Sequence, residues 1–326
     1  MTNIKFDSFW EYFARNLIDG GTALFVFISG FLFHHIFYNR YRYSSFISKK
    51  LLALLLPYTL FAIIPIYFLV EKNSGAWWGF FRATDTGLWH EYILPTLKWY
   101  STGRFYTAYW YIPFIVVTFL ISPLHIWFIR RSIIIQLICV VSLLIVSCLI
   151  YRPVGLINVF QHLVYYTPLY LIGILCSMHK DRVYQGLKGK EIYLLVIVLA
   201  LALFQAYSGH GGNYYKKALV FKGIDYMIFQ KIALSLFFMI WLHRFENIKN
   251  KTIKFSLNYL AAASFAIYFM HPVLLYVAKK QKLYFKVDIP WLALPLITIS
   301  LILTCLVLAI IVKKIIPKYS RYITGY

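Results

Sequence analysis

Nine stretches of this chain are apolar and poor in charge for long enough to cross a lipid bilayer. A membrane-spanning helix needs about 20 mostly apolar residues, and Leu51–Val70 and Trp291–Val312 reach that length without a single charge. Because the hydrocarbon contains no water, each span must satisfy its backbone polar groups internally, as a helix does. We therefore expect an all-α fold, a polytopic integral membrane bundle of about nine transmembrane helices.

The stretches divide the chain into a short leading segment and one membrane domain. The predicted spans are Gly21–Tyr38, Leu51–Val70, Tyr109–Phe128, Ser132–Tyr151, Leu163–Met178, Ile192–Tyr207, Tyr226–Phe245, Leu257–Ala278 and Trp291–Val312. In residues 1–20, charged side chains alternate with phenylalanine and tryptophan, an amphipathic pattern that suits the membrane interface. Residues 21–326 contain no long polar block, so we expect a single membrane domain there.

The net charge of +22 favours a lipid partner rather than nucleic acid. Lysine and arginine form clusters between the apolar stretches, as at Arg130–Arg131 and Lys313–Lys314, which is typical of anchors beside anionic lipid. The four cysteines fall inside apolar stretches and lack metal-ligand spacing, so we expect packing residues, no disulfide framework and no metal site.

The distribution of basic residues predicts the orientation. With nine spans, one set of loops holds 18 lysines and arginines and the other holds 14. Cytoplasmic loops carry the excess, so we expect a multi-pass protein of the cell membrane with a cytoplasmic C-terminus. Lys231 lies within a span, and we expect its side chain to reach outward to the interface.

Four short motifs, in order, resemble those of the acyltransferase 3 family of membrane O-acyltransferases. They are Gly20–Leu32 with its Ile28-Ser29-Gly30-Phe31 core, Phe46–Tyr58 with Lys49-Lys50 and Pro57, Tyr109–Phe114 around Trp110, and Ser264–Pro272 with Tyr268 and His271-Pro272. Together they cover nearly the whole chain from residue 20 onward.

The resemblance implies a helical membrane domain, usually of ten spans, that moves an acyl group from acyl-coenzyme A to a hydroxyl of a glycan or lipid-linked sugar. It implies a first helix that bears an arginine and the catalytic histidine, and this chain starts after that helix would have ended. The family's pair of arginines, three residues apart, aligns with Lys50 and Ala53. On this basis we expect the 326-residue chain to adopt the family fold but to lack transferase activity by itself.

Transfer of an acyl group to a hydroxyl requires a base, and histidine suits that role. His271 lies inside a span, where ionisable groups are functional candidates, although it could instead bond a carbonyl freed by Pro272. His34 and His35 are further candidates, with an interfacial position as the alternative. No metal ligand is predicted.

Binding residues are predicted at both ends of the spans. Lys50 could meet a phosphate of acyl-coenzyme A, or serve only as a topology anchor. Trp110 and Tyr111 could line the entrance for the acceptor, or belong to the aromatic belt of the interface.

Two other classes of function remain open from the sequence. One is a non-catalytic membrane transporter or assembly protein for a glycan, and the other is an inactive remnant. The spans contain no internal aspartate or glutamate, which weighs against a proton-coupled carrier.

Overall fold

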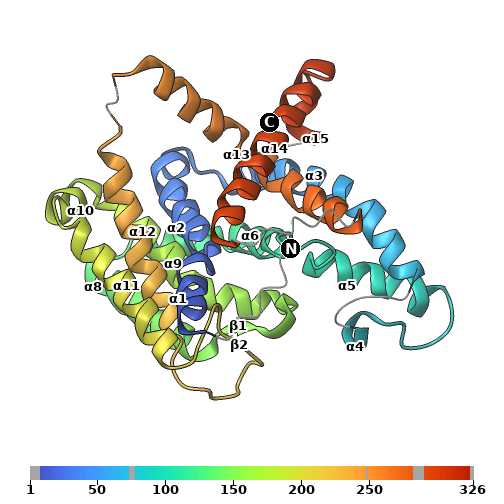
Figure 1. Ribbon diagram of the computed structural model, residues 1–326, viewed down its shortest axis with the longest axis horizontal. Helices are drawn as coiled ribbons and strands as arrows, with labels where there is room; N and C mark the ends of the chain where they lie inside the picture. The colour runs from blue at the N-terminus through green and yellow to red at the C-terminus, as the bar shows by residue number, and fades with distance from the viewer. Residues whose placement is uncertain (1–7, 73–77, 247–248, 282–289, 324–326) are drawn as a thin grey trace.

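The computed structural model describes residues 8–72, 78–246, 249–281 and 290–323, and these form an assembly of helices (Figure 1). Seven of the helical segments are long and apolar enough to cross a membrane, and an eighth is formed by α6 and α7, which are bent by 57° relative to one another. Glu191–Tyr207 is a shorter apolar helix of 17 residues. Each of the nine predicted spans therefore corresponds to an apolar helix or helix pair, and the expected all-α membrane bundle is confirmed.

Most of the helices follow one another with short connections. The α-helices are α1 (Phe9–Ile18), α2 (Thr22–Leu32), α3 (Tyr43–Glu71), α4 (Trp78–Phe81), α5 (Leu94–Thr102), α6 (Tyr111–Leu120), α7 (Ser122–Ile129), α8 (Ile133–Ile150), α9 (Val159–Met178), α10 (Lys180–Leu187), α11 (Glu191–Tyr207), α12 (Tyr226–His243), α13 (Lys251–Lys280), α14 (Pro290–Ile315) and α15 (Ser320–Ile323). Two π-helical turns, η1 (Phe33–Phe37) and η3 (Trp89–Ile93), and two 3₁₀ turns, η2 (Tyr38–Arg40) and η4 (Val154–Leu156), complete the helical elements. Two short parallel strands, β1 (Arg152–Pro153) and β2 (Tyr215–Lys216), pair with each other.

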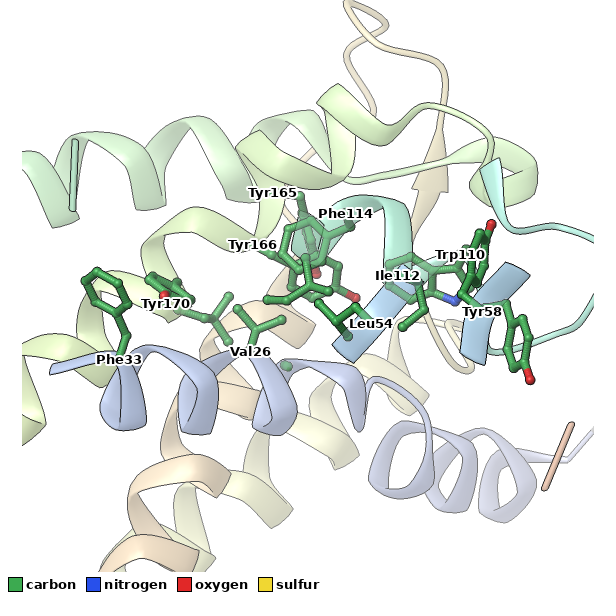
Figure 2. Close-up of a cluster of buried hydrophobic side chains, with 14 of the residues drawn as sticks. Val26, Phe33, Leu54, Tyr58, Trp110, Ile112, Phe114, Tyr165, Tyr166 and Tyr170 are labelled. Atoms are coloured by element: carbon green, nitrogen blue, oxygen red, sulfur yellow. The ribbon is translucent and has the colours of Figure 1, made fainter. Parts of the chain in front are cut away.

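Helices α2 and α9 form the centre of the bundle and approach each other through two glycines. A Cβ atom on Gly30 would overlap the carbonyl of Tyr170, and one on Gly173 would overlap the carbonyl of Phe27. Small residues allow membrane helices to approach this closely, and van der Waals packing then holds them together. Figure 2 shows the adjoining core, in which Val26 and Phe33 lie against the tyrosines of α9.

The remaining helices surround this pair and present apolar side chains outward. We compare the most apolar window of 18 residues in each helix. In α9, 61% of that window is buried, but in α8 only 22% and in α14 only 11%. In water, exposed rows of apolar side chains such as Ile134, Ile138 and Val141 on α8 would be costly. These faces therefore contact the acyl chains of the bilayer.

The loops gather at two opposite ends of the bundle. At the first, which we call the Arg152 end, the backbone N–H of Arg152 donates to the Tyr214 carbonyl (3.2 Å) as β1 meets β2. At the second, the His35 end, the Arg244 side chain bonds Glu191 across α12 and α11 (2.6 Å). A backbone hydrogen bond thus joins the loops at the Arg152 end, and an ion pair joins two helices at the His35 end.

Lys231 does not reach outward as its position in a span suggested. The side chain is 1% exposed, and its Nζ donates to the carbonyls of Asn16 (3.0 Å) and Leu17 (3.1 Å) at the end of α1. These carbonyls lack partners within their own helix, and a lysine there satisfies them and complements the helix dipole. The sequence-based expectation for Lys231 was wrong because it took no account of α1 as a neighbour.

Candidate functional site

Three aromatic rings stack at the Arg152 end, and one of them is the predicted residue Trp110. Trp110 precedes the first residue of α6 and is 4% exposed. Its ring lies 4.2 Å from that of His162, with an angle of 21° between the planes, and 5.9 Å from that of Tyr166. Trp110 is therefore packed inside the bundle, against the first turns of α9.

Within this stack, His162 is the side chain whose polar atoms lack hydrogen-bond partners among the described residues. Its exposure is 0%, and neither ring nitrogen has a hydrogen-bond partner in good geometry among the described residues. The backbone of Leu156 is the polar group that faces the ring. Buried polar atoms are nearly always bonded, so each exception calls for an explanation. A neutral imidazole carries a lone pair on one nitrogen, and none of the described residues donates a hydrogen bond to it.

Arg152 lies beside the stack and is itself buried, with 4% exposure. Its guanidinium carbon is 5.3 Å from the Trp110 ring, 5.8 Å from Tyr166 and 5.2 Å from Tyr215. The aromatic faces attract the cation, but no described residue accepts a hydrogen bond from Nε.

The loop that carries Arg152 is strained. Tyr151 and Leu156 have φ values of 61° and 57°, although neither is a glycine. Such conformations cost about 1–3 kcal/mol each and cluster at functional sites. Gln161 holds the loop in place, since its Nε2 donates to the carbonyls of Ile150 and Lys216, each at 3.1 Å.

A second cation, Arg104, completes the group. Arg104 belongs to the connection between α5 and α6, and its buried Nε has no partner within residues 8–72, 78–246, 249–281 and 290–323. It and Arg152 are the two cations that act electrostatically on His162. Burial lowers the pKa of Arg104, while the Tyr215 hydroxyl opposes that shift; the guanidinium stays charged at neutral pH. We call Arg104, Trp110, Arg152, His162 and Tyr166 the Arg152 site.

Asp225, which caps the start of α12, is an acidic residue that acts electrostatically on Arg152. One carboxylate oxygen accepts from the Met227 N–H (2.9 Å), and the other accepts from the Tyr165 hydroxyl (2.9 Å). Burial raises the pKa of Asp225 to about 7, even though the bonds from Tyr165 and Met227 and the charge of Arg152 oppose the shift. Asp225 makes no direct ion pair with either arginine among the described residues.

The His35 end contains a cavity of about 660 Å³ between α2, α10, α12 and α13. One part of its wall is polar and the other is apolar. The lining residues are Phe31, His35, Lys180, Asp181, Tyr184, Gln185, Met239, Leu242, His243, Phe245, Glu246 and Leu257. Such a mixed wall suits an amphiphilic molecule.

The other predicted residues are spread over the bundle. His35 lines the cavity, whereas Nδ1 of its neighbour His34 is bonded to Ser177 Oγ (2.9 Å). Lys50 places its ammonium 3.9 Å from the centroid of the Phe37 ring and does not line the cavity. These residues belong to the His35 end.

Tyr111 and His271 lie between the ends. The Tyr111 hydroxyl is 3.2 Å from Ser29 Oγ, and its ring contacts that of Tyr268 at 6.0 Å. His271 Nδ1 lies 2.9 Å from the Ile267 carbonyl of its own helix. The structure thus does not bring the predicted histidines, Lys50 and Trp110 into one site.

Sequence reasoning missed His162, Arg152 and Arg104. His162 lies one residue before the predicted span Leu163–Met178, and Arg152 and Arg104 read as ordinary loop cations. A signal was present in Tyr151-Arg152-Pro153, a lone arginine directly after an apolar stretch, but nothing in the sequence placed it next to Trp110.

Comparison with known families gives one match. A family model described as "Acyltransferase domain" matches residues 2–312. Comparison with curated proteins and with solved structures finds no match.

Proposed function

The chain belongs to the family of these acyltransferase domains, and on that premise we propose that it transfers an acyl group, such as acetyl, from acyl-coenzyme A to a hydroxyl of a cell-surface glycan or a lipid-linked sugar. The observation that carries the proposal is the unpartnered His162 imidazole beside Arg152. The pair offers a base and a positive charge at one place, as this reaction requires.

The proposed step needs no group beyond the donor and the acceptor. The acceptor hydroxyl oxygen attacks the thioester carbonyl carbon while His162 takes the hydroxyl proton. A carbon–oxygen bond forms, and Arg152 would stabilise negative charge on the carbonyl oxygen. The carbon–sulfur bond then breaks, and the proton passes to the departing thiolate of coenzyme A.

The cavity at the His35 end supports an amphiphilic donor. Lys180 and His35 are groups that could face phosphates, and Leu242 and Phe31 are apolar groups that could contact a chain. Lys50 is a further candidate for a phosphate contact at this end. The donor and the acceptor would then approach from opposite ends of the bundle.

The test is transfer of labelled acyl groups from acyl-coenzyme A to glycan acceptors by the protein in nanodiscs. We expect His162→Ala to lower the rate by about 10²–10⁴-fold, the usual contribution of a general base, and added imidazole to restore part of it. His125→Ala is the matched control, because His125 is also buried but already bonds the Thr118 carbonyl (3.2 Å).

Equal losses in both variants, without rescue by imidazole, would assign His162 a packing role. Loss only in His271→Ala, His34→Ala or His35→Ala would place the base elsewhere. Movement of glycan across the bilayer without covalent transfer would favour the transporter alternative. Transfer by the unmodified chain, which this proposal requires, would overturn the sequence-based expectation that the chain is inactive by itself.

A further inference from the structure

Arg152 and Arg104 are two cations that the fold holds near the same two rings, those of His162 and Tyr215, and neither pairs with an anion among the described residues. Arg152 is 4% exposed, and each guanidinium has a buried Nε that donates to no acceptor in the part of the chain that the structure describes. Neither arginine makes an ion pair among the described residues, whereas Arg15, Arg244 and His243 each pair with a carboxylate. Buried charges are normally paired, so this arrangement lacks a counter-charge.

The neighbouring groups do not supply that counter-charge. Asp225 has both carboxylate oxygens committed to Tyr165 and Met227. Lys216, which follows Tyr215 in β2, is 3% exposed and adds a further cation, with its Nζ 4.5 Å from the Tyr151 ring. The positive charge of the Arg152 site therefore exceeds its negative charge.

A transient oxyanion does not account for two arginines. That charge exists only during the chemical step and one cation stabilises it, but like charges repel and buried charges are costly throughout the cycle. The strained backbone at Tyr151 and Leu156 adds to the cost of holding Arg152 here. A fixed anion that arrives with a substrate would offset these costs.

We propose that the Arg152 site binds an anionic group of the acceptor between the guanidiniums of Arg104 and Arg152, so that the acceptor is an acidic glycan or a sugar phosphate rather than a neutral sugar. That the anion belongs to the acceptor rests on the proposed function, but the binding of an anion at this site does not. Guanidinium groups match carboxylate and phosphate oxygens with two parallel hydrogen bonds. Tyr215 is exposed and contacts the Arg152 guanidinium, so it marks the side from which the anion enters.

The experiment measures binding directly, without a donor. The purified chain in detergent is titrated with glucuronate, with inorganic phosphate and with neutral glucose, and tryptophan fluorescence is recorded. Because Trp110 lies 5.3 Å from the Arg152 guanidinium, we expect a saturable change with at least one anion and none with glucose. Trp110→Phe should abolish the signal, and added salt should weaken binding.

Charge variants locate the site. We expect Arg104→Gln and Arg152→Lys each to weaken anion binding by about tenfold or more, the usual effect of losing a hydrogen bond to a charged group. Lys217→Gln removes an exposed lysine near β2 and should leave binding unchanged. Arg152→Lys keeps the charge and protects the fold, and the half-buried Arg104 provides a second, independent variant.

Preference for glucuronate over phosphate would identify an acidic sugar, and the reverse would identify a sugar phosphate. No saturable signal with either anion, an equal signal with glucose, or binding unaffected by both arginine variants would overturn the inference. Anion binding without any acyl transfer would instead count against the proposed function alone.

Discussion

The Nζ of Lys231 donates a hydrogen bond of 3.0 Å to the backbone carbonyl of Asn16, 215 residues earlier in the chain. Asn16 is itself fully buried, and its side chain donates to the carbonyls of Ala202 (3.2 Å) and His210 (2.9 Å). The Gly212 N–H donates back to Asn16 Oδ1 (2.7 Å). These bonds attach α1 to α11 and α12.

We expect Lys231→Met to loosen α1 and to lower the stability of the protein. The substitution keeps the length of the side chain but leaves two buried carbonyls without a donor, and hydrogen bonds to charged groups are worth about 1.5–3 kcal/mol. Thermal unfolding in detergent and hydrogen exchange in α1 measure the effect. Lys217→Met, at an exposed lysine, is the control, and equal behaviour of the two variants would contradict the prediction.

Gly30→Ala and Gly173→Ala should separate α2 from α9. Each added Cβ would overlap a backbone carbonyl of the facing helix, which cannot move aside as a side chain can. We expect a loss of about 1–3 kcal/mol or more for each substitution, seen as a lower unfolding temperature and a poorer yield of monodisperse protein. Gly186 on α10 has open space around it, so Gly186→Ala should be neutral or slightly stabilising. A similar loss of stability in that variant would show that overlap with the facing helix is not the cause.

Asp225 should make stability depend on pH between about 4 and 7. Its folded-state pKa of about 7 lies above the ordinary aspartate value of 3.8 because burial favours the protonated acid. The unfolded chain therefore releases this proton at lower pH than the folded chain does, so the contribution of Asp225 is full below pH 4 and is lost as the pH rises to about 7.

Asp225→Asn tests this, because asparagine also caps helices well and has no titrating group. The unfolding temperature of the wild type relative to the variant should fall from pH 5 to pH 7 and then level off. A difference that stays constant over that interval would show that Asp225 does not titrate there.

Lys50→Ala should impair acyl transfer more than Lys49→Ala does. Lys50 is half-buried with its ammonium against Phe37, whereas the Lys49 side chain is exposed. Loss of a contact between a lysine and a donor phosphate should weaken binding of acyl-coenzyme A about tenfold or more, measured as an increase in KM for the donor. Equal, small effects of both substitutions would leave only an anchoring role for Lys50.

The 18-to-14 distribution of basic residues predicts the orientation, and labelling can check it. After replacement of the four native cysteines, a cysteine at Trp89 or Lys217 should react with an impermeant reagent from outside, and one at Lys188 only after permeabilisation. A C-terminal reporter should be active in the cytoplasm. Labelling of Lys188 and Lys217 from the same side would show that α11 does not cross the membrane.

The sequence by itself determined that this chain is a helical membrane bundle. The requirement for internal hydrogen bonding in hydrocarbon leaves helices as the structure for long apolar stretches, and all nine predicted stretches correspond to apolar helices or a bent pair. The motif around Gly30 likewise pointed to the family that the comparison then found, because the glycine, its flanking residues and their order along the chain are local properties.

Only the tertiary structure decided which polar residues share a site. His162 and Trp110 are 52 residues apart in sequence but stack at 4.2 Å, and the pairing of Arg152 with Tyr215 joins two loops that are separated by α9 and α11. Lys231 shows the same limit, since a lysine in an apolar stretch can reach the interface or a buried carbonyl, and its neighbours decide between them. Burial and the lack of a partner are properties of packed neighbours, so no pattern along one helix reports them.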